Sequence, residues 1–164
     1  VSMGGTDEKN LTKIVIEAFE LVEDSFCATI LLGPGYEYTN DLKQKLESVK
    51  YSYNVVEDSN QVAKIMSQCH LAIISYGQTA FELAAMEVPA IYICLTDDHH
   101  DSSQLFVDAG IGYSLGNYIE VNAQKLADAI VNISSGKDGL KKMSLRASYL
   151  NISKLNELVS IILE

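Results

Sequence analysis

The chain has 164 residues, of which 48% are hydrophobic and 21% are charged, and its 22 acidic and 12 basic side chains give a net charge of −10. This length and hydrophobic content fit one soluble domain and leave no room for a second one. The acidity argues against nucleic acids and anionic membrane surfaces as partners, because both repel a negative protein surface. A pocket of backbone N–H groups can still bind one small anion, since such binding depends on local dipoles.

The three cysteines, Cys27, Cys69 and Cys94, are widely spaced and lie in or beside apolar runs. This pattern predicts buried thiols in a reducing cytosol, without a disulfide framework or a CxxC metal or redox motif. The apolar runs are far shorter than the roughly 20 residues that a membrane-spanning helix needs, and no signal segment opens the chain. We therefore expect a cytoplasmic protein that does not span a membrane.

Strands and helices are expected to alternate along the chain. Residues 1–3 resemble the end of a strand whose beginning is missing, which indicates a chain cut at a domain boundary. Apolar residues then recur at helical spacing from Leu11 to Val22, and a β-rich apolar run follows at 27–32. Further strands are expected at 53–56, 71–75, 89–95 and 112–114, and further helices at 40–50, 61–69, 79–87 and 102–109. Two or three more helices are expected within 122–163.

Strands that are apolar at every position and separated by helices predict a parallel sheet that is covered on both faces. The expected fold is α/β, a Rossmann-like doubly wound parallel sheet with C-terminal helices, formed by residues 1–164 as a single domain. Sheets of this kind bind ligands at the carboxyl ends of their strands, so the loops after the strands are where function is expected.

The first such loop contains Gly4, Gly5, Thr6 and Asp7, ahead of a helix expected to begin near Lys9. The glycines allow a tight turn with bare N–H groups, and the Thr6 hydroxyl and the helix N-terminus suit a phosphate oxygen. A plain alternative is a tight turn in which Thr6 or Asp7 caps the helix.

The second loop runs from Ser75 through Gly77 to Thr79 and leads into a helix. Gly77 allows a ligand to approach the backbone closely, and the Glu82 carboxylate can accept two hydrogen bonds from a ribose diol. The alternative is a capping box, because Thr79 and Glu82 have the T-x-x-E spacing in which the two residues satisfy each other's backbone N–H groups.

The third loop, residues 96–104, is the densest polar cluster of the chain and includes His99 and His100. Its Asp and His side chains suggest a metal site, but neighbouring residues of an irregular loop point in different directions, and no pair of histidines has the i, i+4 spacing. The remaining interpretations are a loop that contacts a sugar and a solvated turn in which Asp101 or Ser102 caps the next helix.

Taken in this order, the three loops resemble the C-terminal domain of GT-B sugar-nucleotide enzymes such as the peptidoglycan N-acetylglucosaminyl transferase. Within that group the chain looks most similar to the UDP-sugar hydrolase of pseudaminic acid biosynthesis and to spore-coat polysaccharide proteins. The resemblance covers roughly residues 1–116. Beyond them, the chain shares with the family only its helical character. It is carried by four stretches, 1–7 with Asn10, 75–85, 88–91 and 104–110.

The resemblance implies a nucleotide-binding set in which each residue contacts the diphosphate, the ribose or the base: Gly4, Gly5, Thr6, Asp58, Gly77, Gln78, Thr79 and Glu82. The two glycine loops would contact the diphosphate, Glu82 the ribose hydroxyls, and the main chain near Asp58 the uracil.

The sugar would meet His99 and His100. Related proteins often carry an Asn-Gln or Asp-Gln pair at that place, so the sugar specificity is left open.

The resemblance also implies an activity. A UDP-sugar would be hydrolysed to free sugar and UDP, with the catalytic histidine on an N-terminal domain that this chain lacks. No catalytic residue, metal or other cofactor is then expected here, and the chain alone should be inactive. The partners would be a UDP-sugar and the protein's own N-terminal domain.

Several alternatives stay open at this stage. The same nucleotide site serves a glycosyltransferase, and a non-catalytic binding module would retain the half-fold without turnover. UDP, CMP and dTDP are not distinguished. A signalling receiver domain shares the acidity and the strand–helix alternation, but it needs an acidic pair where this chain has Gly4, Gly5 and Thr6.

Overall fold

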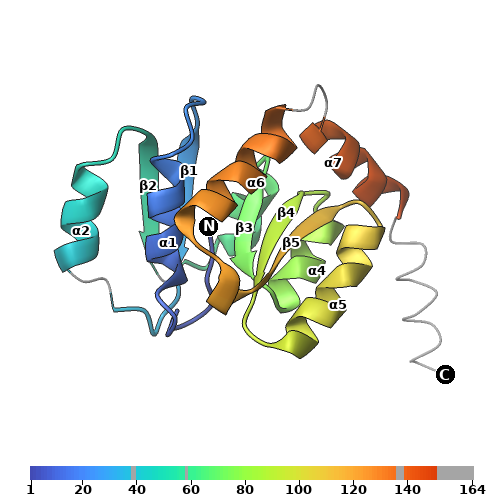
Figure 1. The fold of residues 1–164 in the computed structure, drawn as a ribbon, viewed down its shortest axis with the longest axis horizontal. Helices are drawn as coiled ribbons and strands as arrows, with labels where there is room; N and C mark the ends of the chain where they lie inside the picture. The colour runs from blue at the N-terminus through green and yellow to red at the C-terminus, as the bar shows by residue number, and fades with distance from the viewer. Residues whose placement is uncertain (38–39, 58, 136–138, 151–164) are drawn as a thin grey trace.

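The computed structural model describes residues 1–37, 40–57, 59–135 and 139–150 as strands and helices that alternate (Figure 1). The strands are β1 (Cys27–Leu32), β2 (Ser52–Glu57), β3 (Ala72–Ser75), β4 (Ala90–Cys94) and β5 (Gly112–Asn117). The helices are α1 (Leu11–Phe19), α2 (Asn40–Glu47), α3 (Val62–Ser67), α4 (Gln78–Ala85), α5 (Asp97–Asp108), the 3-10 turn η1 (Tyr118–Glu120), α6 (Ala123–Ser135) and α7 (Gly139–Tyr149).

All the strands run parallel. β1 pairs with β2, and β4 lies between β3 and β5. Ser2 joins these two groups, because it bridges Leu31 of β1 and Ile74 of β3. The resulting order is β2, β1, residues 1–3, β3, β4, β5, which is the 3-2-1-4-5-6 order of doubly wound nucleotide-binding sheets. The direction of winding reverses between residues 1–3 and β3, so that is where a ligand crevice is expected.

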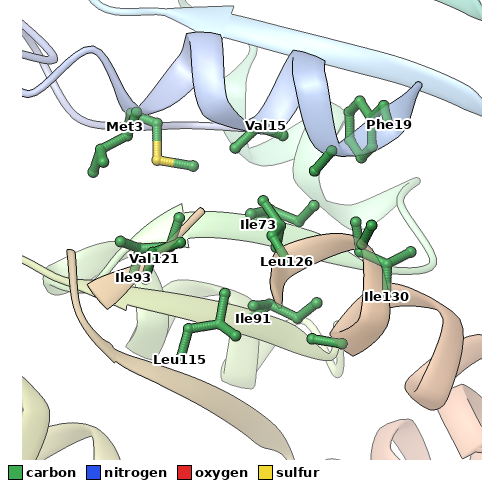
Figure 2. Packing of buried hydrophobic residues seen from close by; sticks show 14 of the residues in the cluster. Met3, Val15, Phe19, Ile73, Ile91, Ile93, Leu115, Val121, Leu126 and Ile130 are labelled. Atoms are coloured by element: carbon green, nitrogen blue, oxygen red, sulfur yellow. The ribbon is translucent and has the colours of Figure 1, made fainter. Parts of the chain in front are cut away.

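Helices cover both faces of the sheet. On one face α1 and α6 pack side by side, and Figure 2 shows Val15 and Phe19 of α1 above the strand residue Ile73, with Leu126 of α6 close to Ile73 and Ile91. On the other face the side chains of α4 and α5 pack with those of β3 and β4 in a second cluster. Every residue of β4 is buried, as two-sided cover requires. The expected doubly wound parallel sheet is confirmed.

Some boundaries differ from expectation. α1 ends at Phe19 and not near Val22, and β5 extends to Asn117. α5 begins at Asp97 rather than Ser102, because Thr96 caps it and acidic residues occupy its first turn, where the helix dipole favours them. The expected C-terminal helices include α6 and α7, and residues 151–164 lie outside the described part.

The cysteines are all free, but one prediction about them is wrong. Cys94 is buried and Cys69 partly so, whereas Cys27 is exposed. Cys27 is the first residue of β1, at the amino end of the sheet.

Candidate functional site

The first loop, residues 4–7, is fixed by close backbone contact with the loop after β1. Gly35 donates its N–H to the carbonyl oxygen of Gly5 over 3.0 Å. A Cβ at Gly33 would lie 2.5 Å from the Gly5 Cα, and one at Gly35 would lie 2.8 Å from the Thr6 methyl carbon. The sequence indicated Gly33-Pro34-Gly35 only as the end of a strand. In the structure this run packs against the first loop.

Asp7 closes this loop onto α1. Its two carboxylate oxygens accept the backbone N–H groups of Leu11 and Thr12, each over 2.8 Å, and the side chain is only 7% exposed. These amides are among the free donors at the start of α1. The Asp7 carboxylate thus occupies these two amides, in line with the capping alternative, and phosphate binding at this loop stays a prediction.

The second loop lies beside the first at the reversal point of the sheet. Ser75 donates its N–H to the carbonyl oxygen of Ser2, and a Cβ at Gly4 would lie 3.6 Å from the Ser75 hydroxyl oxygen. Gly4 has φ +84°, a conformation that only glycine adopts easily. The fold therefore brings the two glycine loops together, although more than 70 residues separate them along the chain.

The start of α4 is open, unlike that of α1. Its N-cap residue is Gly77, and no side chain caps the helix. The capping box of Thr79 and Glu82 is therefore not formed, because the helix begins two residues too early for Thr79 to be the cap. Gln78 and Glu82 are exposed and Thr79 partly so, and a Cβ at Gly77 would have no atom within 4 Å. The first amides of α4 consequently face open space.

Aromatic packing ties the second loop to α5. The Tyr76 ring is buried and lies 5.5 Å from the Tyr92 ring and 6.0 Å from the Phe106 ring, between centroids. Burial raises the pKa of both tyrosine hydroxyls. The His99 ring lies 5.8 Å from Tyr76, so the first turn of α5 borders the second loop.

His99 and His100 thus stand on a helix and not on a loop. The His99 backbone N–H donates to the Thr96 hydroxyl over 3.1 Å, and the turn capped by Asp101 or Ser102 is not formed. The His99 Nδ1 atom is buried without a hydrogen-bond partner in the described part of the chain.

The His100 Nδ1 atom lies 3.5 Å from the hydroxyl of Ser114, which also accepts from the Ser103 hydroxyl over 3.0 Å. His100 is therefore held by a polar network between α5 and β5.

One expected site residue, Asp58, lies outside the described residues. Within the described ranges, no group of three or more His, Cys, Asp or Glu side chains is arranged to hold a metal ion. The same part of the chain contains no helix that is long and apolar enough to cross a membrane.

The sequence interpretation also missed residues. Asp7 was named only as an alternative helix cap, and the support from Gly33 and Gly35 was not recognised. The spacing of Asp7 four residues before Leu11, and the Gly-x-Gly after the next strand, were the available signals.

Comparison with protein families identifies the chain. The model of the glycosyltransferase family 28 C-terminal domain matches residues 1–160. The chain belongs to this family. A related curated protein is the spore coat polysaccharide biosynthesis protein SpsG of Bacillus subtilis, 25% identical over 118 residues, which are 71% of this chain and 34% of that protein.

An uncharacterized protein of Methanocaldococcus jannaschii is 27% identical over 95 residues, 57% of this chain and 20% of that protein. The matched part of this family 28 domain thus spans about a third or less of the length of these relatives.

Solved structures agree on the fold of the family 28 domain. The MurG structure of Acinetobacter baumannii matches with a TM-score of 0.73 at 18% identity, over 88% of this chain and 42% of that one. The spinosyn rhamnosyltransferase SpnG in complex with thymidine diphosphate matches with a TM-score of 0.60 at 20% identity, over 84% of this chain and 35% of that one. Both likenesses concern the fold.

Proposed function

We propose that this chain is the donor-binding domain of a glycosyltransferase and holds the nucleotide diphosphate of a sugar donor between its two glycine loops. The observation that carries the proposal is the open N-terminus of α4 beside the first loop, at the reversal point of the sheet. Unsatisfied N–H groups and a helix dipole directed at one place favour an anion. Because these donors are backbone groups, the net charge of −10 does not oppose such a site.

Each residue of the proposed nucleotide site then has its own role. Gly5, Thr6 and Gly77 line open space where phosphate oxygens can approach the backbone, and Gln78 and Thr79 supply the first amides of α4. Glu82 lies one turn along the same helix, exposed, and its carboxylate makes no hydrogen bond to another residue of the described part. It is therefore available for the ribose hydroxyls. The main chain near Asp58, the residue that follows β2 in the sequence, is proposed to contact the base.

His99 and His100 are proposed to meet the sugar, because the start of α5 borders the second loop. The acceptor site and the second half of the active site are proposed to lie on the protein's own N-terminal domain, since this chain covers only 34% of the SpsG protein and 42% of the MurG chain. One domain would position the donor, and the reaction would take place in the cleft between the two domains. For this reason no catalytic residue is proposed in this chain.

Transfer is preferred to hydrolysis. The family is named for glycosyltransferases, and MurG-like and spinosyn transferases share the fold. None of the relatives described above favours the UDP-sugar hydrolase or the link to pseudaminic acid that the sequence resemblance implied. The thymidine diphosphate in the spinosyn enzyme supports a nucleoside diphosphate as the ligand class for this chain.

Calorimetric titration with UDP, dTDP and CMP tests the proposal. A diphosphate should bind more tightly than CMP, and Glu82→Gln should weaken its binding by about 1–3 kcal/mol, the usual loss for a hydrogen bond to a charged group. Glu87→Gln is the matched control, since Glu87 is exposed and lies two residues beyond the last residue of α4. If neither diphosphate shifts the amide NMR signals of Gly5 and Gly77 at millimolar concentration in the folded protein, the proposal is wrong.

A further inference from the structure

The surroundings of the proposed nucleotide site are rich in negative charge. Glu8 in the first loop, Glu82 on α4, and Asp97 and Asp98 in the first turn of α5 are all exposed. The dipole at the start of α1 is already matched by the buried Asp7 carboxylate. A donor diphosphate adds further negative charge, so the open start of α4 alone leaves the charge of the ligand poorly balanced.

Lys9 is the basic side chain best placed to balance this charge. Six loops follow the carboxyl ends of residues 1–3 and of β1 to β5, and only the first of them contains a lysine or an arginine, which is Lys9. Lys9 is exposed, and two Cα steps, at most about 7.6 Å, separate it from Asp7. It therefore lies at the same edge of the sheet as the glycine loops.

The backbone on both sides of Lys9 is held in one conformation. Asp7 and Asn10 have φ +45° and +54°, in the left-handed region that these residue types tolerate. The Asn10 N–H donates to the carbonyl oxygen of Asp7 over 2.8 Å, and the Asp7 carboxylate holds the first turn of α1. Strained backbone of this kind clusters at ligand-binding segments. The flexible stem of Lys9, and not the loop, is therefore expected to move when a ligand binds.

The Lys9 ammonium has an aromatic partner in place of an acidic one. Its Nζ atom lies 5.5 Å from the centre of the Tyr118 ring, and it forms no ion pair within the described residues. Contacts of this type are weak at exposed positions. A phosphate oxygen accepts a charge-assisted hydrogen bond from an ammonium, so a bound phosphate would draw Lys9 away from the ring.

Tyr118 is a fixed platform for this side chain. It is partly buried and packs against the core cluster of α1, α6 and the strands. The side chain of the preceding Asn117 accepts the N–H of Ile119 over 3.3 Å and donates to a carboxylate oxygen of Asp97 over 3.0 Å. The platform thus keeps the ammonium at this edge of the sheet before a ligand binds.

We propose that Lys9 is the cation that binds the diphosphate of the donor, and that its ammonium leaves the Tyr118 ring for a phosphate oxygen when the nucleotide binds. The inference rests on the proposed function, which it deepens by assigning the side-chain charge that the diphosphate meets. One noncovalent contact replaces another, so no covalent bond changes and the loop keeps its backbone conformation.

Calorimetry with UDP and dTDP, followed by use of the tighter ligand, tests the assignment. Lys9→Gln removes the charge at similar length and should weaken binding at least about tenfold, whereas Lys9→Arg should stay within about threefold of the wild type. Lys142→Gln is the matched control, because Lys142 is exposed on α7 and its loss changes the net charge equally. This control should change the affinity by less than about twofold, since distant surface charges are screened.

NMR follows the movement of the side chain. The ring current of Tyr118 should shift the Lys9 side-chain protons upfield in the free protein, and Tyr118→Leu should abolish that shift. Saturating nucleotide should bring the same protons of the wild type to their position in Tyr118→Leu. Lys9→Arg identifies the signals, because they disappear from its spectrum.

The outcomes separate this inference from the proposed function. If the nucleotide shifts the Gly5 and Gly77 amide signals of the wild type but binds Lys9→Gln equally tightly, Lys9 is not its cation and the proposed site stands. Lys9 protons that keep their upfield shift at saturation would also overturn the inference. If neither nucleotide shifts those amide signals, the proposed function and the assignment of Lys9 are both wrong.

Discussion

Gly35 donates its backbone N–H to the carbonyl oxygen of Gly5, and this bond joins two loops that follow neighbouring strands of the sheet. The contact requires the chains to approach more closely than side chains allow. It therefore accounts for glycine at positions 33 and 35, and it links the shape of the first loop to the loop after β1.

Gly33→Ala should destabilise the fold. The added Cβ would lie 2.5 Å from the Cα and carbonyl oxygen of Gly5, which are backbone atoms that cannot rotate away. We expect a loss of about 1–3 kcal/mol in the free energy of unfolding, as for other overpacked sites, measured by urea denaturation. Gly5→Ala is the control, because its Cβ would have no atom within 4 Å. Equal losses in the two variants would contradict this account of the loop contact.

Gly77→Ala should separate binding from stability. Gly77 has φ 170°, an extended conformation open to any residue, and an added Cβ would meet nothing within 4 Å. The unfolding midpoint should therefore be unchanged or slightly raised. If the proposed site is correct, the methyl group occupies space needed by the diphosphate, and affinity for UDP or dTDP should fall at least about tenfold, or 1.4 kcal/mol. Unchanged affinity would place the ligand elsewhere.

The sequence predicted the sheet well because each strand carries its own signal. β1, β3 and β4 are apolar runs, and the two-sided burial of β3 and β4 follows directly from that composition, whereas buried and partly buried residues alternate in β1. The glycine-rich loops were also recognisable, because each follows the carboxyl end of an apolar strand, and these ends lie at one edge of a parallel sheet. Their neighbourhood across the sheet follows from the strand order, which the sequence did not give and which the bridges at Ser2 show.

The helix starts were predicted less well because caps depend on single side chains. Thr79 and Glu82 have the spacing of a capping box, yet packing of the Tyr76 ring against Tyr92 and Phe106 accompanies a helix that starts after Gly77. The polar run at 96–104 contains few apolar residues, so its helical period was hidden, although Thr96 is a good cap.

Asp7→Ala should weaken the start of α1. The carboxylate accepts two backbone N–H groups at 2.8 Å in a buried place, and Asp7 has φ +45°, which alanine adopts poorly. Removing both acceptors should cost about 1–3 kcal/mol of unfolding free energy, measured by chemical denaturation. Asp7→Asn keeps one acceptor and tolerates the left-handed conformation, so its loss should be smaller. The exposed neighbour Glu8 supplies the control, and a Glu8→Ala loss as large as that of Asp7→Ala would refute the capping role.

Stability should depend on pH through Val1 in the chain that begins at this residue. Burial lowers the pKa of its amine from 8.0 to about 6. The unfolded chain then binds more protons than the folded one between these values, so stability is greatest above pH 8 and falls as pH drops towards 6. Two pKa units correspond to about 2.7 kcal/mol. Urea denaturation of the free and the N-acetylated chain at pH 8.5 and 5.5 measures the effect. The other titrating groups are common to both proteins, so the free chain should lose more stability on acidification, and parallel losses would show that the amine is solvated.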